Sequence, residues 1–206
     1  MTKQNSLLRS TANTRPVLPG SLRYIRSDVP WQVTTSEIEW LIEQNIRTII
    51  DLRTDAEQES KPCRLAADDR FVYLHLPVTG GDTVPAAPDD VTDSYIRMVD
   101  EQMLRILAAI RNAPTNVLYF CNAGKDRTGV VSAILQKMFD VPEETIIADY
   151  IRSGENLAAQ LEAFEKANPA VDPRVIRPQS AYMEQFLAWL NGHHAEAGIH
   201  AGRSGE

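Results

Sequence analysis

The sequence has few cysteines and no long apolar run, and each absence excludes a class of protein. Its two cysteines, Cys63 and Cys121, are too few for a disulfide scaffold and lack a metal-ligand spacing such as C-x2-C. No apolar run approaches the roughly 18 residues that a membrane-spanning helix needs, and no apolar signal region follows the basic N-terminus. We therefore expect a cytoplasmic protein without an integral membrane segment.

Positive charge is also in short supply. The chain has 21 Lys and Arg against 28 Asp and Glu, which gives a formal net charge of −7. Such a charge repels polyanions, so nucleic acid is not an expected partner. Residues 1–27 are the exception, because they carry five basic residues and no acid, and we expect a solvated basic arm there.

The length and composition are those of one packed domain. Of the 206 residues, 43% are hydrophobic and 24% are charged, as in ordinary globular proteins. We predict a single domain over residues 1–191 and a flexible tail over residues 192–206, which are rich in Gly, Ala and His. The tail histidines His193, His194 and His200 have no acidic or Cys partner at ligand spacing, so we predict no metal site.

Apolar runs rich in β-branched residues alternate with segments of helical period. This alternation predicts an α/β fold with a central, mostly parallel sheet flanked by helices and with a helical C-terminal half. We expect strands at residues 48–52, 72–78 and 117–120. The last of these, VLYF, is expected to be central because it is apolar on both faces.

The spacing of apolar side chains at about 3.6 residues predicts the helices. Ser36 and Glu39 have the spacing of a capping box at the start of the first one. The expected helices are residues 36–44, 91–111, 128–139, 142–152, about 156–167 and 180–190.

The most informative stretch is Phe120-Cys-Asn-Ala-Gly-Lys-Asp-Arg-Thr-Gly129, between the predicted central strand and the next helix. A strand, a Gly-containing loop and a helix N-terminus form an anion cradle, because successive N–H groups converge where the helix dipole is positive. Cys121 lies at the base of this cradle, and the loop amides and Arg127 favour its nucleophilic thiolate form. The same field suits a phosphate dianion, whose oxygens an Arg can hold bidentately.

The spacing of these residues is specific. A Cys followed by Gly at +3, Arg at +6, Ser or Thr at +7 and Gly at +8 arises by chance in roughly one sequence in ten thousand of this length. The alternative interpretation is an inert buried thiol at Cys121 and a surface residue at Arg127.

These residues resemble the cysteine-dependent protein tyrosine and dual-specificity phosphatases, which carry a C-x5-R-[ST] loop. The loop is most similar to the bacterial atypical branch, whose signature is HCxAGKDRTG, although Phe120 stands where that signature has His. Three further segments extend the resemblance over most of residues 15–155: Gly20-Ser-Leu-Arg-Tyr-Ile-Arg-Ser27, Ile49-Ile-Asp-Leu-Arg53 with the following Glu57, and Ala148-Asp-Tyr-Ile-Arg-Ser153.

The resemblance implies a fold of the phosphotyrosine-phosphatase type and a two-step reaction that needs no metal or cofactor. Cys121 attacks phosphorus to form a phosphocysteine, which water then hydrolyses, and Arg127 stabilises the phosphoryl group in both steps. Thr128 offers its hydroxyl to the leaving sulfur, or is simply a helix N-terminal residue. The implied substrate-binding residues are Asn122, Ala123, Gly124, Lys125, Asp126, Arg127, Asp51 and Arg53.

Several carboxyl groups compete for the role of general acid, which protonates the leaving oxygen. The atypical branch has an Asp inside the loop, here Asp126, whereas classical relatives have one on a flexible loop, here Asp82. Asp89, Asp90 and Asp93 are further candidates. The structural alternatives are a helix cap for Asp126 and a Gly-Gly-Asp turn for Asp82.

Two charged residues near the end of the predicted strand 48–52 also have open interpretations. Asp51 orients Arg127 through a buried ion pair, as the resemblance favours. Arg53 either contacts substrate or pairs with Glu57 at i+4.

Lys125 either adds charge over the phosphate or is a solvated lysine. Cys63 either forms a reversible disulfide with Cys121, as resolving thiols do in some relatives, or is an ordinary thiol.

Three functions therefore remain open. The first is a phosphatase for phosphotyrosine, with phosphoserine and phosphothreonine as further substrates. The second is a phosphoinositide phosphatase, because Lys125 suits a highly charged head group. The third is a catalytically inactive phosphate-binding module, against which the joint presence of Cys121, Arg127 and Thr128 argues. The expected partner is thus a phosphorylated protein or a phosphoinositide.

Overall fold

The computed structural model describes residues 6–199, which fold around a five-stranded sheet in the order β1-β2-β5-β3-β4. Its strands are β1 (Arg15–Pro16), β2 (Tyr24–Ser27), β3 (Ile46–Asp51), β4 (Val72–His75) and β5 (Asn116–Phe120). Only β1 and β2 pair antiparallel, and the other neighbours pair in parallel. The predicted sheet, with VLYF in its central strand, is confirmed.

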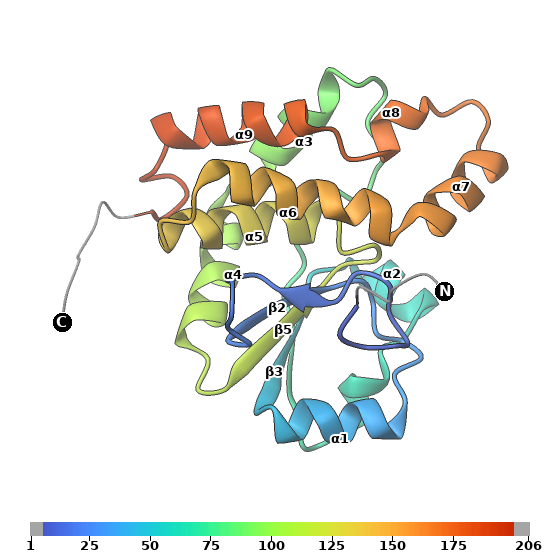
Figure 1. The fold of residues 1–206 in the computed structure, drawn as a ribbon, viewed down its shortest axis with the longest axis vertical. Helices are drawn as coiled ribbons and strands as arrows, with labels where there is room; N and C mark the ends of the chain where they lie inside the picture. The colour runs from blue at the N-terminus through green and yellow to red at the C-terminus, as the bar shows by residue number, and fades with distance from the viewer. Residues whose placement is uncertain (1–5, 200–206) are drawn as a thin grey trace.

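Helices cover both faces of the sheet (Figure 1). On one face lie α1 (Thr35–Glu43) and a 3-10 turn at Arg64–Ala67. The other helices are α2 (Asp55–Ser60), α3 (Asp90–Arg97), α4 (Glu101–Asn112), α5 (Arg127–Met138), α6 (Glu143–Asn156), α7 (Ala158–Ala167), α8 (Pro173–Ile176) and α9 (Ser180–Gly192). The face opposite α1 carries the larger core cluster, to which α3, α4, α5, α6, α8 and α9 contribute.

The side chains of β5 point alternately to the two faces of the sheet and so contribute to both core clusters. Val117 and Tyr119 pack into the larger cluster, whereas Leu118 and Phe120 pack into the smaller one. Because successive side chains of a strand point to opposite faces, a central strand must be apolar on both. This burial fixes β5, and with it the start of the loop that follows.

Among the helix starts that differ from the sequence prediction, two involve capping residues. The segment 91–111 is two helices, because the Asp100 carboxylate accepts the N–H of Met103 and caps α4 with an extended backbone (φ −139°, ψ −172°). The capping box of α1 consists of Thr34 and Glu37 and not of the predicted Ser36 and Glu39.

The predicted solvated basic arm is wrong for Arg15 and Arg26, whereas Arg9 is exposed. Arg15 and Arg26 are 3% and 1% exposed, and both bind the Asp149 carboxylate of α6, at 2.6 and 2.5 Å. The paired guanidinium groups join β1 and β2 to the helical layer. Residues 1–5 lie outside the described residues.

The predicted tail is packed in its first part. Residues 193–199 turn back after α9, and Ala197 and Ile199 are buried in the larger core cluster. Residues 200–206, including His200, lie outside the described residues. Between residues 6 and 199, no helix is long and apolar enough to cross a membrane.

Candidate active site

The loop of residues 121–126 follows β5 at the carboxyl end of the parallel strands and leads into α5. Cys121 directly follows the strand and is 3% exposed. The backbone N–H groups of residues 122–127 have no protein acceptor within the described part of the chain. They are therefore available to an anion, in the position where the dipole of α5 is positive.

The carbonyl groups of this loop are held from outside by the N-terminal segment. The Asn13 amide donates to the carbonyls of Ala123 (3.1 Å) and Gly124 (3.0 Å), and Arg26 donates to Gly124 at 2.8 Å. In a trans peptide the N–H points opposite to the C=O, so bound carbonyls on the outside turn N–H groups inward. Gly124 has φ +65°, and a Cβ there would lie 2.3 Å from the Ser27 carbonyl oxygen, so glycine is required.

Arg127, at the start of α5, is held by Glu57 of α2. The two guanidinium nitrogens Nη1 and Nη2 lie 2.6 and 2.7 Å from the two carboxylate oxygens. Burial lowers the pKa of Arg127, but the hydrogen bonds to Glu57 and the charge of Cys121 outweigh it, so the pKa is raised overall. Glu57 also accepts the side-chain amide of Asn122 and forms a capping box with Thr54. One carboxylate thus joins α2, the loop and α5.

The predicted ion pair between Asp51 and Arg127 is wrong, because Asp51 binds Arg53. The Arg53 Nε and Nη2 atoms lie 2.9 and 2.7 Å from the Asp51 carboxylate, which also accepts the Tyr73 hydroxyl at 2.7 Å. Arg53 reaches Glu57 only at its backbone carbonyl, so the predicted side-chain pair is also absent. Asp51 and Arg53 are fully buried at the end of β3, so their side chains are not accessible to a substrate.

Sequence reasoning missed the role of Glu57 because the short helix α2 was not predicted. A signal was present, since Thr54 and Glu57 have the T-x-x-E spacing of a capping box. The ion pair between Arg26 and Asp149 was also not predicted, although both residues lie in segments that resemble the family.

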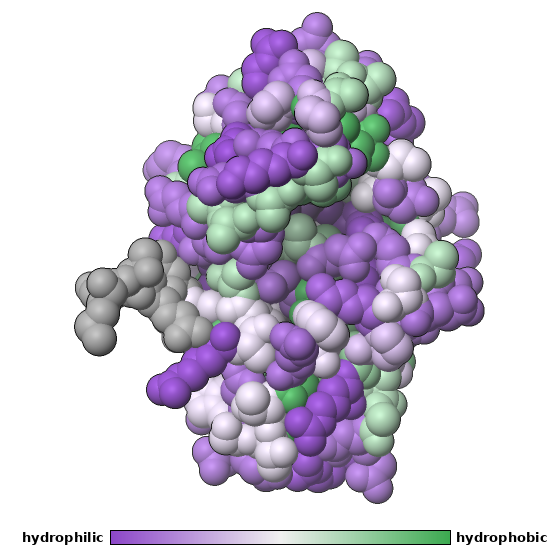
Figure 2. All heavy atoms as spheres, turned by 90° about the vertical axis from the view of Figure 1, so that its right-hand side faces the viewer, coloured by the Kyte–Doolittle hydropathy of each residue, from purple (hydrophilic) through white to green (hydrophobic). Residues whose placement is uncertain are grey.

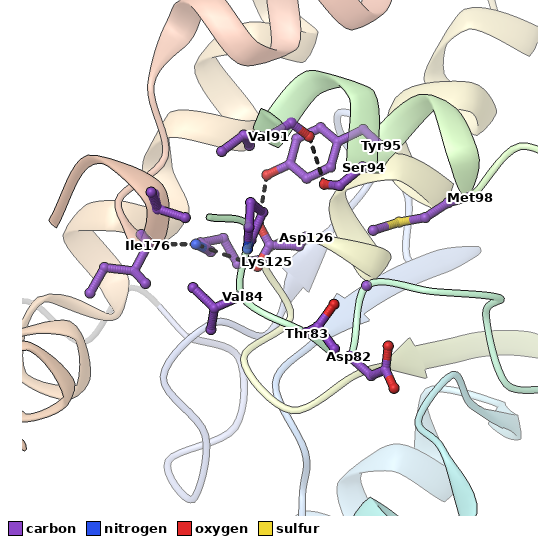
Figure 3. Close-up of a pocket in the computed structure, with 13 residues that line it drawn as sticks. Asp82, Thr83, Val84, Val91, Ser94, Tyr95, Met98, Lys125, Asp126 and Ile176 are labelled. Atoms are coloured by element: carbon purple, nitrogen blue, oxygen red, sulfur yellow. Dashed lines mark hydrogen bonds and ion pairs between the residues drawn. The ribbon is translucent and has the colours of Figure 1, made fainter. Parts of the chain in front are cut away.

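Asp126 receives a hydrogen bond from a buried tyrosine. The Tyr95 hydroxyl of α3 donates to the Asp126 Oδ1 atom at 2.5 Å (Figure 3). The same hydroxyl lies 2.8 Å from the Tyr150 hydroxyl. Burial, together with the charge of Asp126, raises the pKa of Tyr95, so its hydroxyl remains a donor. Although Asp126 precedes α5, its side chain makes no capping hydrogen bond. Its carboxylate therefore faces α3 and not the helix backbone.

Lys125 is neither solvated nor free. It is 5% exposed, its Nζ donates to the Ile176 carbonyl of α8, and it lies 3.4 Å from the Asp126 Oδ2 atom (Figure 3). A cavity of about 110 Å³ adjoins these side chains, between α3, α8 and the loop that carries Asp82. The lysine thus ties the loop of residues 121–126 to α8 at the cavity wall.

The loop that carries Asp82 lies directly on Arg127. Gly81 has φ +72°, and a Cβ there would lie 2.4 Å from Met98 and 2.9 Å from the Arg127 side chain. Asp82 itself is exposed, and Figure 3 shows its carboxylate turned away from Asp126.

The further acidic candidates are exposed at the start of α3, where the Asp90 carboxylate accepts the N–H of Ala87. The group consists of Asp89, Asp90 and Asp93. Among the candidate acids, Asp126 is therefore the one that a buried hydroxyl holds in place.

Three other predicted residues have distinct environments. The Thr128 hydroxyl is buried and has no partner among residues 6–199. Phe120 is fully buried beneath the Arg53 guanidinium, 5.3 Å from its ring centre. Cys63 packs in the core cluster on the opposite face of the sheet from that of Cys121, and burial raises its pKa to about 11. Both cysteines are free thiols.

The sequence model of the tyrosine phosphatase family matches residues 9–199 of the chain. A tyrosine-protein phosphatase of Nostoc commune is 28% identical over 164 residues, which are 74% of this chain and 55% of that protein. A Cupriavidus necator protein named as a candidate tyrosine-protein phosphatase is 25% identical over 183 residues, which are 80% of this chain and 66% of that one. The chain thus spans between half and two thirds of the length of these curated relatives.

Solved structures are also similar to this chain. One of them is the crystal structure of TpbA from P. aeruginosa, which is 19% identical. The match covers 71% of this chain and 82% of that one, with a TM-score of 0.40.

Proposed function

The chain belongs to the tyrosine phosphatase family, and from this premise we propose that it hydrolyses phosphotyrosine monoesters through a phosphocysteine intermediate. The observation that carries the proposal is the loop of residues 121–127. It combines a cysteine at its base, inward N–H groups without an acceptor in the described part of the chain, and an arginine that a carboxylate holds in place. These are a nucleophile and a preorganised positive field for a phosphoryl group.

In the first step, the Cys121 thiolate attacks phosphorus in line with the leaving oxygen. The P–S bond forms as the P–O bond to the tyrosine ring breaks, and a carboxyl proton passes to the leaving oxygen. Arg127 and the loop N–H groups hold the phosphoryl oxygens, where negative charge remains throughout the transfer.

In the second step, water attacks the phosphocysteine and the sulfur leaves as a thiolate. The proton of the water passes to the carboxylate that acted in the first step, which restores the enzyme. The hydroxyl of Thr128 supports this step, because it is buried next to Arg127 in the sequence, has no partner among residues 6–199 and can donate to the sulfur.

Asp126 is the general acid that the geometry supports best. The hydrogen bond from Tyr95 holds its carboxylate toward the cavity beside the loop, where a leaving group can lie. Asp82 remains the alternative, because its loop rests on Arg127. The two assignments predict different dependences of the rate on the leaving group.

Phosphoserine and phosphothreonine are further substrates under this proposal, since the mechanism does not depend on an aromatic leaving group. The phosphoinositide alternative rests on Lys125. That side chain is engaged by Ile176 and Asp126, so it supports a multiply charged head group less than a free lysine would. The positive field at the phosphate is then that of Arg127 and the amides.

The test is a serine at position 121. We expect Cys121→Ser to lose at least about a thousandfold in turnover of a phosphotyrosine peptide, because a hydroxyl is scarcely ionised at neutral pH. Binding of the same peptide should persist, since the amide cradle survives, and calorimetry measures it.

The matched control is Cys63→Ser, which changes the other cysteine on the far side of the sheet and should retain turnover. Peptides with phosphotyrosine, phosphoserine and phosphothreonine, together with soluble phosphoinositides, define the substrate class. A Cys121→Ser protein with about a tenth of the original activity would contradict the covalent mechanism.

A further inference from the structure

A second, larger hollow of about 780 Å³ opens at the other end of the phosphate-binding loop. The loop supplies Asn122 and Ala123 to the wall of this hollow, whereas Lys125 and Asp126 line the smaller cavity. Figure 2 shows the face that carries α2 and α7, which is hollowed between the helical layer and the sheet. Both cavities thus adjoin the loop on which the proposed function places the phosphate. We call the larger hollow the flanking groove.

Aromatic rings and basic side chains line the flanking groove together. Trp31 and Phe164 are 44% and 38% exposed, large apolar surfaces that a protein otherwise buries. The Lys61 Nζ atom lies 4.8 Å from the centre of the Trp31 ring, which is a cation–π distance. Arg9 adds a second, exposed basic side chain.

The charge of the groove is opposite in sign to that of the whole chain. Asp28 is the one acid among the described residues that line the groove, and its two carboxylate oxygens accept the N–H groups of Ala12 and Asn13, at 3.0 and 2.8 Å. These bonds satisfy the Asp28 carboxylate with backbone N–H groups, and although its charge acts on Lys61, the described lining has one more basic than acidic side chain. In a chain of net charge −7, two basic residues beside an anion-binding loop attract a negatively charged ligand to this place.

We propose that the flanking groove binds the peptide residues next to the phosphotyrosine. An acidic side chain pairs with Lys61 and Arg9, and an apolar side chain packs on Trp31 and Phe164. The inference rests on the proposed function, because it assumes that the phosphate lies at the loop. A peptide fits these walls better than an inositol phosphate does, since a head group has no apolar side chain for the aromatic rings. The volume suits several residues, as it lies in the range of roughly 300–1,000 Å³ of ligand sites.

The test uses matched phosphotyrosine peptides that share one sequence. One carries Glu and Leu beside the phosphotyrosine, and two others replace Glu with Gln or Leu with Ser, with the pair moved through three positions on either side. A small aryl phosphate serves as the substrate without flanking residues. We expect kcat/KM to favour the Glu and Leu peptide over its Gln version by about tenfold at the best position.

The variants then locate this preference. Lys61→Gln should reduce the preference for Glu to about twofold, and Trp31→Ala should reduce the preference for Leu to a similar extent. The matched control is Lys166→Gln, an exposed lysine on the same helix as Phe164 that is not part of the groove wall, and it should keep both preferences. Thermal unfolding of each variant verifies that the fold is retained.

Several outcomes would overturn the groove assignment. They are equal rates on all peptides, preferences that survive both Lys61→Gln and Trp31→Ala, or variants that slow phosphoinositide turnover but not peptide turnover. The peptides are also measured by calorimetry with the Cys121→Ser protein, where the same ranking is expected without turnover. Absence of hydrolysis of every ester by the original protein would instead contradict the proposed function, while the binding ranking would still test the groove.

Discussion

Arg127 owes its position to a carboxylate that lies 70 residues earlier in the chain. Two parallel hydrogen bonds from its guanidinium to Glu57 orient the planar group and leave its remaining N–H groups for the phosphoryl oxygens. A lysine at this position would carry the same charge but would lack the planar guanidinium with its parallel N–H donors. The geometry of one side chain therefore carries much of the proposed catalysis.

We expect Arg127→Lys to lower kcat/KM for a phosphotyrosine peptide by at least about a hundredfold, because a point charge cannot bind Glu57 and two phosphoryl oxygens together. Steady-state kinetics at saturating and subsaturating peptide measure the loss. The variant Arg105→Lys, on the exposed surface of α4, is the control. Near-normal kinetics in Arg127→Lys would show that another group holds the anion.

The general acid is tested by its dependence on the leaving group. A phenol needs a proton as it leaves, whereas an activated aryl ester hardly does, so loss of the acid slows only the first. We expect Asp126→Asn to slow the phosphotyrosine peptide by about a hundredfold relative to an activated aryl phosphate.

Asp82→Asn is the comparison, and it should slow both esters equally or not at all. If Asp82→Asn shows the leaving-group dependence and Asp126→Asn does not, the acid belongs to the loop over Arg127. The hydrogen bond from Tyr95 would then serve the fold of the loop and not the proton transfer.

At the scale of elements, the six-residue helix α2 brings one carboxylate to the site. Its capping box with Thr54 sets the start of the helix, and this places Glu57 on the first turn, beside Arg127 and Asn122. Burial alone would raise the pKa of Glu57, but the hydrogen bonds from Arg127 and Thr54 lower it by more. The net shift of the pKa is therefore downward, and the group remains ionised. Glu57 is therefore a positioning residue that acts through Arg127.

We expect Glu57→Gln to lower kcat/KM by about tenfold while α2 persists, because Gln also serves at the third position of a capping box. Glu59→Gln, an exposed neighbour on the same helix, should have little effect. The decisive measurement is a double-mutant cycle with Arg127→Lys. If the two losses simply multiply, Glu57 does not act through Arg127.

At the scale of the whole molecule, Asp149 connects the helical layer to the sheet. Its carboxylate binds Arg15 and Arg26, and Arg26 in turn holds the Gly124 carbonyl in the loop of residues 121–126. Burial alone would raise the pKa of Asp149, but the two guanidinium groups lower it by more, so that the pKa lies below its ordinary value of 3.8. Burial also disfavours the charged form of Arg15 and lowers its pKa to about 10, which leaves this group charged at neutral pH.

A carboxylate whose pKa is lowered by folding stabilises the fold at any pH above its pKa in the unfolded chain. This contribution is lost as the pH falls through the pKa of the folded state. We therefore expect Asp149→Asn to lower the free energy of unfolding by about 3–5 kcal/mol at pH 7, because two buried guanidinium groups lose their partner. Urea titrations at several pH values should show the difference narrowing below about pH 4. Asp69→Asn, at an exposed position, is the control, and a difference that is independent of pH would contradict the assignment.

Much of this molecule follows from local sequence pattern. The parallel sheet, the central strand β5 and most helices are encoded by apolar periodicity, because burial of one face or both is a local requirement. The loop from Cys121 to Arg127 is equally local, since an anion cradle needs only a strand, a glycine and a helix start in succession. The family was predicted from these residues, and the family match confirms it.

The partners of the charged residues were decided only by the tertiary structure. Arg127 binds Glu57 and not Asp51, and Arg15 and Arg26 bind Asp149 instead of water. Burial of a charge demands a partner, but several acids of similar spacing could meet that demand, and periodicity does not distinguish them. The choice depends on which elements the sheet brings to one edge, across separations of 70 residues or more.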